Sequence, residues 1–318
     1  MLQSVDSTTH PVDVVMYHYV RPLEQTAFPR IKGLHVDAFE RQLDWLTANT
    51  RIITMDEFLV MLDTGQTAQE PTSLLTFDDG LRDHVEVVMP ALLRRGLTGA
   101  FYVPSAPIVN HELLDVHRIQ FILASIDADD ADQVAAILDA CRPAMLEHLA
   151  PGRLAELQNE AQASRFDTPD VILIKRLLQR ELPRHVRREL TAELFARFVT
   201  SDESAFAGEL YLDMSDLQAM VDVGMHIGSH ADTHEWLTFL DEQEQERELR
   251  TCLALLESVG SADRWTMAYP YGDHDDVTLA ITERLSCAAA FTTKVGGAQT
   301  ATDMRLTLPR YDTNDFPQ

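Results

Sequence analysis

The sequence contains little lysine, and its charge is strongly unbalanced. Its only lysines are Lys32, Lys175 and Lys294, and 26 basic residues stand against 51 acidic ones, which gives a formal net charge of −25. Proteins bind nucleic acid and anionic membranes through Lys and Arg, so this balance argues against both as partners. A neutral sugar would not be repelled by such a surface.

Cysteine is also scarce, and long apolar runs are absent. The three cysteines, Cys141, Cys252 and Cys287, are far apart and odd in number, which argues against a disulfide framework and favours a reducing compartment. The first residues, MLQSVDSTTHPVDVV, contain no basic segment followed by an apolar one, and no apolar run approaches the ~18 residues of a membrane span. We therefore expect no signal peptide, no membrane span and a cytoplasmic location.

The patterned part of the chain predicts an α/β protein. Short apolar runs, such as those at 12–18 and 72–77, alternate with amphipathic stretches such as that at 36–49, which is typical of parallel βα units. From about Pro107 the strand pattern stops, and it resumes near residue 211. We predict one discontinuous α/β domain, 12–106 and 211–316, with a helical insertion at 107–210.

The first motif whose residues could take part in catalysis is TFDDG, at Thr76–Gly80. Asp78 and Asp79 follow a predicted buried strand, and parallel βα folds place their sites at that end of the strands. Neighbouring residues at a strand end point in different directions, so one carboxylate can bind metal while the other handles a proton. A helix N-cap followed by a turn would use the same residues.

The second motif is GSHADTH, at Gly228–His234, again after a predicted strand. The four-residue spacing of His230 and His234 places both imidazoles on one side of a helical turn or a tight loop. Together with an aspartate they provide three ligands and an open fourth position, the composition of a catalytic zinc-type site. A single histidine here would more simply be structural.

Two further strand ends contain candidate residues. In YPYG, Pro270 and Gly272 require a sharp turn, which can expose a backbone N–H to a developing oxyanion, although it could also be only a turn. In VMYHYV, His18 lies where the first predicted strand ends. A general acid with a pKa near neutrality would come from such a residue, and a structural role is the alternative.

TFDDG, HxxxH and PYG, in this order, resemble the polysaccharide deacetylase family, also called carbohydrate esterase family 4. The resemblance implies an imperfect (β/α)7-type barrel and a divalent metal, usually zinc. It also implies a metal-dependent carbohydrate N-deacetylase, which removes N-acetyl groups from an amino-sugar glycan or its precursor and releases acetate. By position, Asp78 resembles the catalytic base and Asp79 a metal ligand together with His230 and His234. Tyr271 matches the residue whose backbone N–H completes an oxyanion hole.

The chain departs from the family pattern at three places. Ala231 stands where Ser or Thr is usual, so one hydrogen bond of that loop is missing or replaced. Ala268 stands where an Arg commonly orients the base, and we expect Arg310, in LPRYDTND, to substitute for it. No histidine follows His274, so the usual C-terminal acid is absent. The N-terminal MYH motif resembles the permuted arrangement in some members, which assigns that role to His18.

Two other functions remain open at this point. A small non-peptide amide, as in allantoinase-like relatives, would use the same fold and metal. A sugar-binding pseudoenzyme would agree with the two departures at the base and the acid. Acetate release and bound metal distinguish these alternatives from an N-deacetylase.

Overall fold

A computed structural model describes residues 9–128, 130–163 and 167–317 of the chain. Packing divides the chain into two compact units. Unit 1 consists of Met1–Arg21, Gly33–His111 and Gly208–Gln318, and unit 2 of Pro22–Lys32 and Glu112–Ala207. The sequence-based division into residues 12–106 and 211–316 with an insertion at 107–210 stays a prediction, because compactness alone defines these units.

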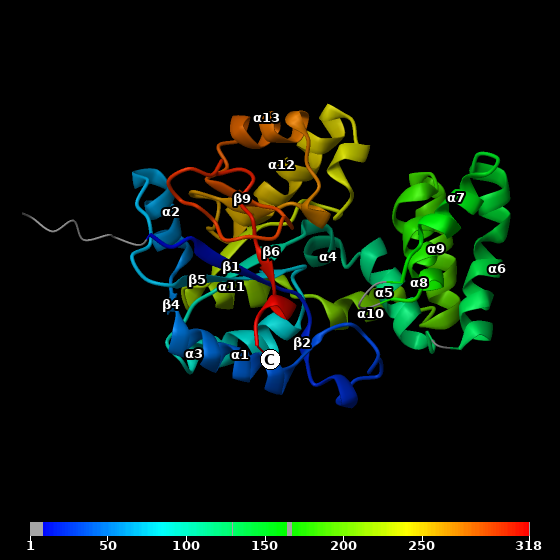
Figure 1. Cartoon of the computed structure of the whole chain (residues 1–318), viewed down its shortest axis with the longest axis horizontal. Coiled ribbons are helices and arrows are strands. Elements are labelled where there is room, and N and C mark those ends of the chain that lie inside the picture. Colours follow the sequence, from blue (N-terminus) through cyan, green and yellow to red (C-terminus); the bar gives the residue numbers. More distant parts are fainter. Residues whose placement is uncertain (1–8, 129, 164–166, 318) are drawn as a thin grey trace, which may run out of the picture. The chain divides into compact units, whose positions relative to one another are not determined.

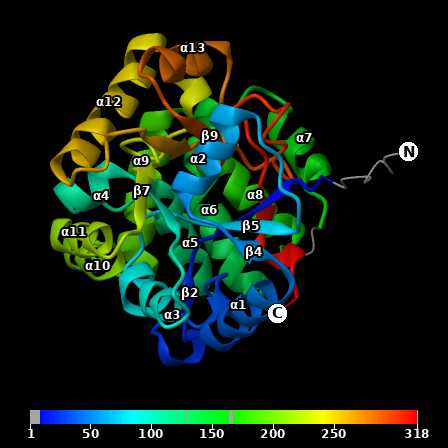
Figure 2. The same ribbon diagram turned by 90° about the vertical axis from the view of Figure 1, so that its left-hand side faces the viewer.

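Unit 1 is built on a curled parallel sheet. Its strands follow the order β10-β1-β5-β6-β7-β8-β9, with β4 paired to β5, and every pairing is parallel. Helices lie around this sheet (Figures 1 and 2). The described strands are β1 (Val12–Tyr17), β4 (Arg51–Ile52), β5 (Thr72–Asp78), β6 (Ala100–Val103), β7 (His226–Ser229), β8 (Thr266–Ala268), β9 (Ala289–Phe291) and β10 (Tyr311–Asp312), and a separate pair is β2 (Val20–Arg21) with β3 (Leu34–His35).

The central strands β5 and β6 are buried on both faces, as is typical of a parallel sheet covered by helices. All seven residues of β5 are buried. On one face, Tyr17, Phe77 and Phe101 occupy matching positions of β1, β5 and β6 and stack with centroid distances of 5.0 and 4.8 Å. Because side chains alternate along a strand, Asp78 lies on the face opposite Phe77.

Local signals in the sequence determine where the helices of unit 1 begin and end. Helix α2 starts with a capping box, in which Thr54 and Glu57 bond each other's backbone N–H groups, and stops at Gly65 with a φ of 65°. Helix α12 starts with the same device at Asp241. The helices are α1 (Val36–Asn49), α2 (Met55–Thr64), α3 (Met89–Leu93), α4 (Ser105–Asn110), α11 (Met214–Asp222), α12 (Glu242–Ser258) and α13 (Asp276–Arg284).

Unit 2 is helical. Its helices are α5 (Asp115–Ser125), α6 (Ala131–His148), α7 (Arg153–Glu160), α8 (Pro169–Arg176) and α9 (Arg184–Phe198), and α10 (Glu203–Leu210) leads out of it. Four phenylalanines of unit 2 form edge-to-face contacts, with centroids 4.8–5.9 Å apart: Phe28, Phe121, Phe195 and Phe206. Aromatic pairs of this kind are worth about 0.5–1.5 kcal/mol beyond the area they bury.

The predicted fold class is confirmed: the chain is α/β, with a (β/α)7-like curled parallel sheet and surrounding helices. Helix α3 is short and is preceded by a π-helical turn, His84–Val88. Pro90 lacks an amide hydrogen, so the regular bonding pattern is interrupted beside it.

Among the described residues, none of the helices combines the length and the apolar character needed to cross a lipid bilayer.

Candidate metal centre and active site

The carboxyl ends of β1, β5, β7 and β8 lie at one edge of the sheet, because these strands are parallel. Each is followed by a residue singled out from the sequence: His18 after β1, Asp79 after β5, His230 after β7 and Tyr271 after β8. Strand order alone therefore brings together residues that are far apart in the chain.

Asp79, His230 and His234 form a compact group. Oδ1 of Asp79 lies 3.4 Å from Nε2 of His230 and 3.5 Å from Nε2 of His234. One candidate ligand atom from each residue lies within 4.8 Å of the other two, and all three side chains are buried. One carboxylate oxygen and two imidazole nitrogens are a donor set that suits a divalent transition metal such as zinc.

The backbone orients His230 for this task. Nδ1 of His230 lies 2.6 Å from the carbonyl oxygen of Ala268. A carbonyl can only accept, so Nδ1 donates, and in the neutral ring Nε2 then presents a lone pair toward Asp79. Burial by itself would lower the pKa of His230, but hydrogen bonding to Asp79 and the nearby Asp78 carboxylate raise it. The Asp79 carboxylate thus lies beside both imidazoles, where it can attract a cation.

Asp78 has a different partner from Asp79. Nη1 and Nη2 of Arg310 donate to Oδ1 and Oδ2 of Asp78 at 2.9 and 2.7 Å, and both residues are about 1% exposed. Nε of Arg310 also donates to the carbonyl oxygen of Thr292. Burial alone would raise the pKa of Asp78, yet Arg310 holds it below its ordinary value. Asp78 is therefore ionised at neutral pH and fixed in direction.

His18 lies beside Asp78. Tyr17 pairs with Phe77 in the β1–β5 register, so the next residues of the two strands are neighbours. His18 is among the groups whose electrostatic influence lowers the pKa of Asp78. The His18 carbonyl accepts a hydrogen bond from Nε2 of the buried His84, which fixes the backbone at this strand end.

The PYG turn places Tyr271 against the second histidine. The Tyr271 ring lies 4.7 Å from the His234 ring, and its backbone has a φ of 58°. Gly272 follows with a φ of 72°, and a Cβ there would lie 2.4 Å from Oγ1 of Thr293. Glycine is therefore required for this turn to pack as it does.

The sequence reasoning missed several supporting residues. The indole of Trp236 stacks on the Tyr271 ring at 4.2 Å, and Asp273 accepts hydrogen bonds from N and Oγ1 of Thr238, which ties the loops after β7 and β8 together. Glu248, on α12, binds the loop between the two histidines. Of these residues only Trp236, two positions after the HxxxH motif, could have been suspected from the sequence. Asp273 and Glu248 have no local sequence signal.

A parallel curled sheet with an Asp–His–His group beside an ionised aspartate has the composition of a metallohydrolase. The family profile described as polysaccharide deacetylase matches residues 192–290, which include His230, His234 and Tyr271 but not the two aspartates. The match covers less than a third of the chain, so this segment is similar to polysaccharide deacetylases, and the fold agrees with that similarity.

Solved structures with a similar fold include deacetylases from several bacteria. Streptococcus pyogenes PplD, in complex with acetate, is 16% identical with a TM-score of 0.57, covering 96% of this chain and 93% of its own. IcaB from Ammonifex degensii is 15% identical with a TM-score of 0.56, covering 95% and 91%. The BpsB deacetylase domain from Bordetella bronchiseptica is 13% identical with a TM-score of 0.52, covering 95% of each chain. A search of curated proteins finds no match.

Proposed function

We propose that this chain is a metal-dependent N-deacetylase, which hydrolyses the acetamido group of an N-acetylated sugar or oligosaccharide to acetate and an amine. The observation that carries the proposal is the pairing of two differently held aspartates at the end of β5. Asp79 faces His230 and His234, and Asp78 is gripped by Arg310. The family profile and the acetate complex of PplD support the choice of an acetyl substrate.

In this proposal Asp79, His230 and His234 hold a divalent cation, with zinc the best fit to one oxygen and two nitrogen ligands. A cation bound there supplies Lewis acidity, which makes a water molecule more acidic and draws electron density from the acetamide carbonyl.

The remaining groups handle protons and charge. Asp78, kept ionised by Arg310, accepts a proton from the water molecule as the water oxygen bonds to the carbonyl carbon. The backbone N–H of Tyr271 donates to the oxygen that becomes negative. His18 gives a proton to the sugar nitrogen as the C–N bond breaks, so acetate and an amino sugar leave. The rings of Trp236 and the half-exposed Phe239, stacked with centroids 5.9 Å apart, offer the sugar an aromatic surface near the site.

The test combines metal analysis of the purified protein with acetate release from N-acetylglucosamine oligomers. We expect about one equivalent of zinc and metal-dependent acetate release. Asp78→Asn should keep the metal and lose at least ~10²-fold in rate, because it removes the base but no ligand. Asp216→Asn is the matched control. The Asp216 carboxylate, on α11, pairs with Arg82, and its substitution should leave the rate unchanged.

Other outcomes would contradict the proposal in distinct ways. Ring opening or ammonia release from small cyclic amides, without acetate release from sugars, would show an allantoinase-like substrate. Bound metal and bound sugar without hydrolysis would show a pseudoenzyme. Normal turnover by Asp78→Asn would show that another group is the base.

A further inference from the structure

The loop between the two candidate ligands has an unusual backbone. Ala231 has a φ of 60° and His234 a φ of 55°. Residues other than glycine seldom adopt this left-handed conformation, and they keep it only where surrounding contacts enforce it. The directions of both imidazoles depend on this backbone, so the contacts that enforce it matter to the site.

Glu248 of α12 supplies contacts on one side of the loop. Its Oε2 accepts hydrogen bonds from the backbone N–H groups of Asp232 and Thr233, at 3.1 and 2.7 Å. Its Oε1 accepts from Oγ1 of Thr233 at 2.8 Å. Glu248 is 3% exposed, so these bonds lie away from competing water.

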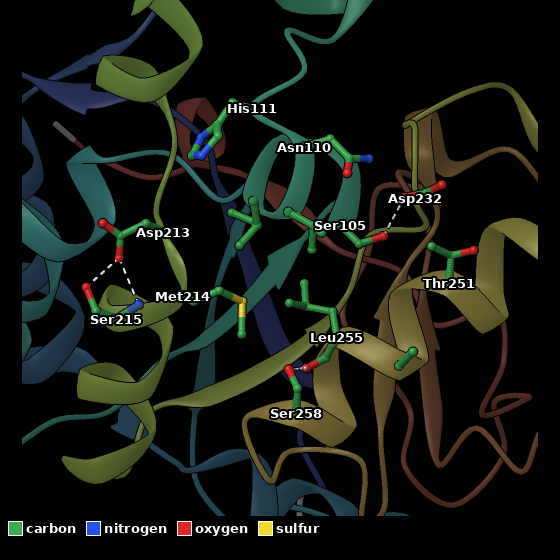
Figure 3. A pocket seen from close by; sticks show the side chains of 13 residues that line it. Ser105, Asn110, His111, Asp213, Met214, Ser215, Asp232, Thr251, Leu255 and Ser258 are labelled. Carbon is green, nitrogen blue, oxygen red and sulfur yellow. Dashed lines mark hydrogen bonds between the residues drawn. The ribbon is translucent and has the colours of Figure 1, made fainter. Parts of the chain in front are cut away.

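Helix α4 supplies contacts on the other side. The N–H groups of Ser105 and Ala106 donate to the carbonyl oxygens of Ala231 and Asp232, at 3.2 and 3.0 Å. Oγ of Ser105 donates to Oδ1 of Asp232 at 2.6 Å, the bond drawn in Figure 3 beside a cavity of about 800 Å³. The loop is thus held between two helices, and Glu248 is the one residue here that binds successive N–H groups and a side chain at once.

We propose that Glu248 is a positioning residue for the metal centre. Its carboxylate fixes the backbone at residues 231–233, and through it the direction in which Nε2 of His230 and of His234 faces Asp79. It thereby replaces the loop hydrogen bond that Ala231, having no hydroxyl, does not make. The inference rests on the proposed function, in that Asp79, His230 and His234 are taken as the ligands.

Two substitutions separate geometry from charge. Glu248→Ala removes all three hydrogen bonds. Glu248→Gln retains one oxygen for the two N–H groups, and its amide nitrogen can donate to the hydroxyl of Thr233, which rotates to accept. If Glu248 acts by holding the loop in position, Glu248→Gln should retain the zinc affinity that Glu248→Ala loses.

The experiment measures zinc affinity of the metal-free full chain by competition with a chromophoric chelator, and the visible spectrum of the cobalt-loaded chain. We expect Glu248→Ala to weaken zinc binding by about 10–100-fold, the usual effect of losing a residue that supports a ligand, and to change the cobalt spectrum. Glu248→Gln should lie close to wild type in both.

Gln245→Ala is the matched control. Gln245 is 2% exposed on the same helix; its side chain donates to the Leu240 carbonyl and accepts from Oγ1 of Thr278, both of which lie outside the loop 231–234. Its loss should lower stability and leave zinc affinity unchanged.

Equal zinc affinity of Glu248→Ala and wild type would overturn the inference, and so would an equal loss in Gln245→Ala. If Glu248→Ala does not fold, Thr233→Val removes only the hydroxyl bond and should weaken zinc binding by about 10-fold; unchanged affinity there would likewise overturn it. A wild-type chain that binds no metal would instead refute the proposed function.

Discussion

Two adjacent aspartates at the end of β5 have opposite surroundings. Asp78 continues the strand and meets Arg310, whereas Asp79 has a φ of 80° and turns toward His230 and His234. Because the backbone changes direction between these two residues, the Asp78 carboxylate points to Arg310 and the Asp79 carboxylate points to the two imidazoles. Substituting either aspartate should therefore remove a different function.

At the same scale, His18 can be tested as the general acid. His18→Ala should slow hydrolysis of an N-acetylated sugar on the order of 10²-fold, the usual contribution of such a group. The same variant should hydrolyse 4-nitrophenyl acetate nearly as fast as wild type, because 4-nitrophenolate leaves without being protonated. The measurement is the ratio of the two rates.

His35→Ala provides the comparison, since His35 is a partly buried histidine that caps α1. It should leave the ratio unchanged. An equal loss on both substrates in His18→Ala would indicate a structural role for His18.

At the scale of elements, signals local in the sequence predicted well. The strand before TFDDG and the strand before HxxxH were both expected, because a short apolar run is a signal contained within a few residues. The short pair β2–β3 and helix α4 were not expected, since each depends on contacts made elsewhere. Helix α4 is six residues long and its cap makes no side-chain hydrogen bond.

The turn after β8 allows a stability test. Gly272→Ala should lower the free energy of unfolding by about 2–3 kcal/mol, since Ala must adopt a positive φ and its Cβ would meet backbone and side-chain atoms of Thr293. Urea denaturation of the variant measures this.

Gly65→Ala isolates the backbone contribution. Gly65 has a similar φ of 65°, but no atom lies within 4 Å of a Cβ placed there. Gly65→Ala should lower the free energy of unfolding by only about 1 kcal/mol. Equal costs at both positions would show that crowding at Thr293 has no effect.

At the scale of the whole molecule, the motifs predicted which residues meet in the candidate site, but not the residues that support them. The two aspartates and the two histidines were chosen by motif, and Arg310 by the lack of an arginine at position 268. The partner of Asp78 is 232 positions away, however, and only the closing of the sheet brings it there. Glu248 resembles any charged residue of an amphipathic helix until that helix packs against the loop.

Acid stability depends on a histidine buried under this site. His84 is fully buried against the rings of Phe77 and Phe101, and burial lowers its pKa to about 4. Between pH 6.5 and 4 the unfolded chain therefore binds a proton that the folded chain does not, so stability falls as pH falls. The contribution of one such group is about 1.4 kcal/mol per pH unit at most.

His84→Gln keeps a donor for the His18 carbonyl but cannot titrate. The pH dependence of its unfolding free energy between pH 6.5 and 4, measured by denaturation, should be shallower than that of wild type by about one proton. Parallel curves for the two proteins would show that His84 is protonated in the folded state as well.

The ion pair between Asp78 and Arg310 joins the end of β5 to the segment just before β10, the last strand of the sheet. No partial structure that lacks residues near 310 can orient the base, even if the metal ligands are already assembled. Turnover should therefore report completion of the fold, whereas metal uptake can begin earlier.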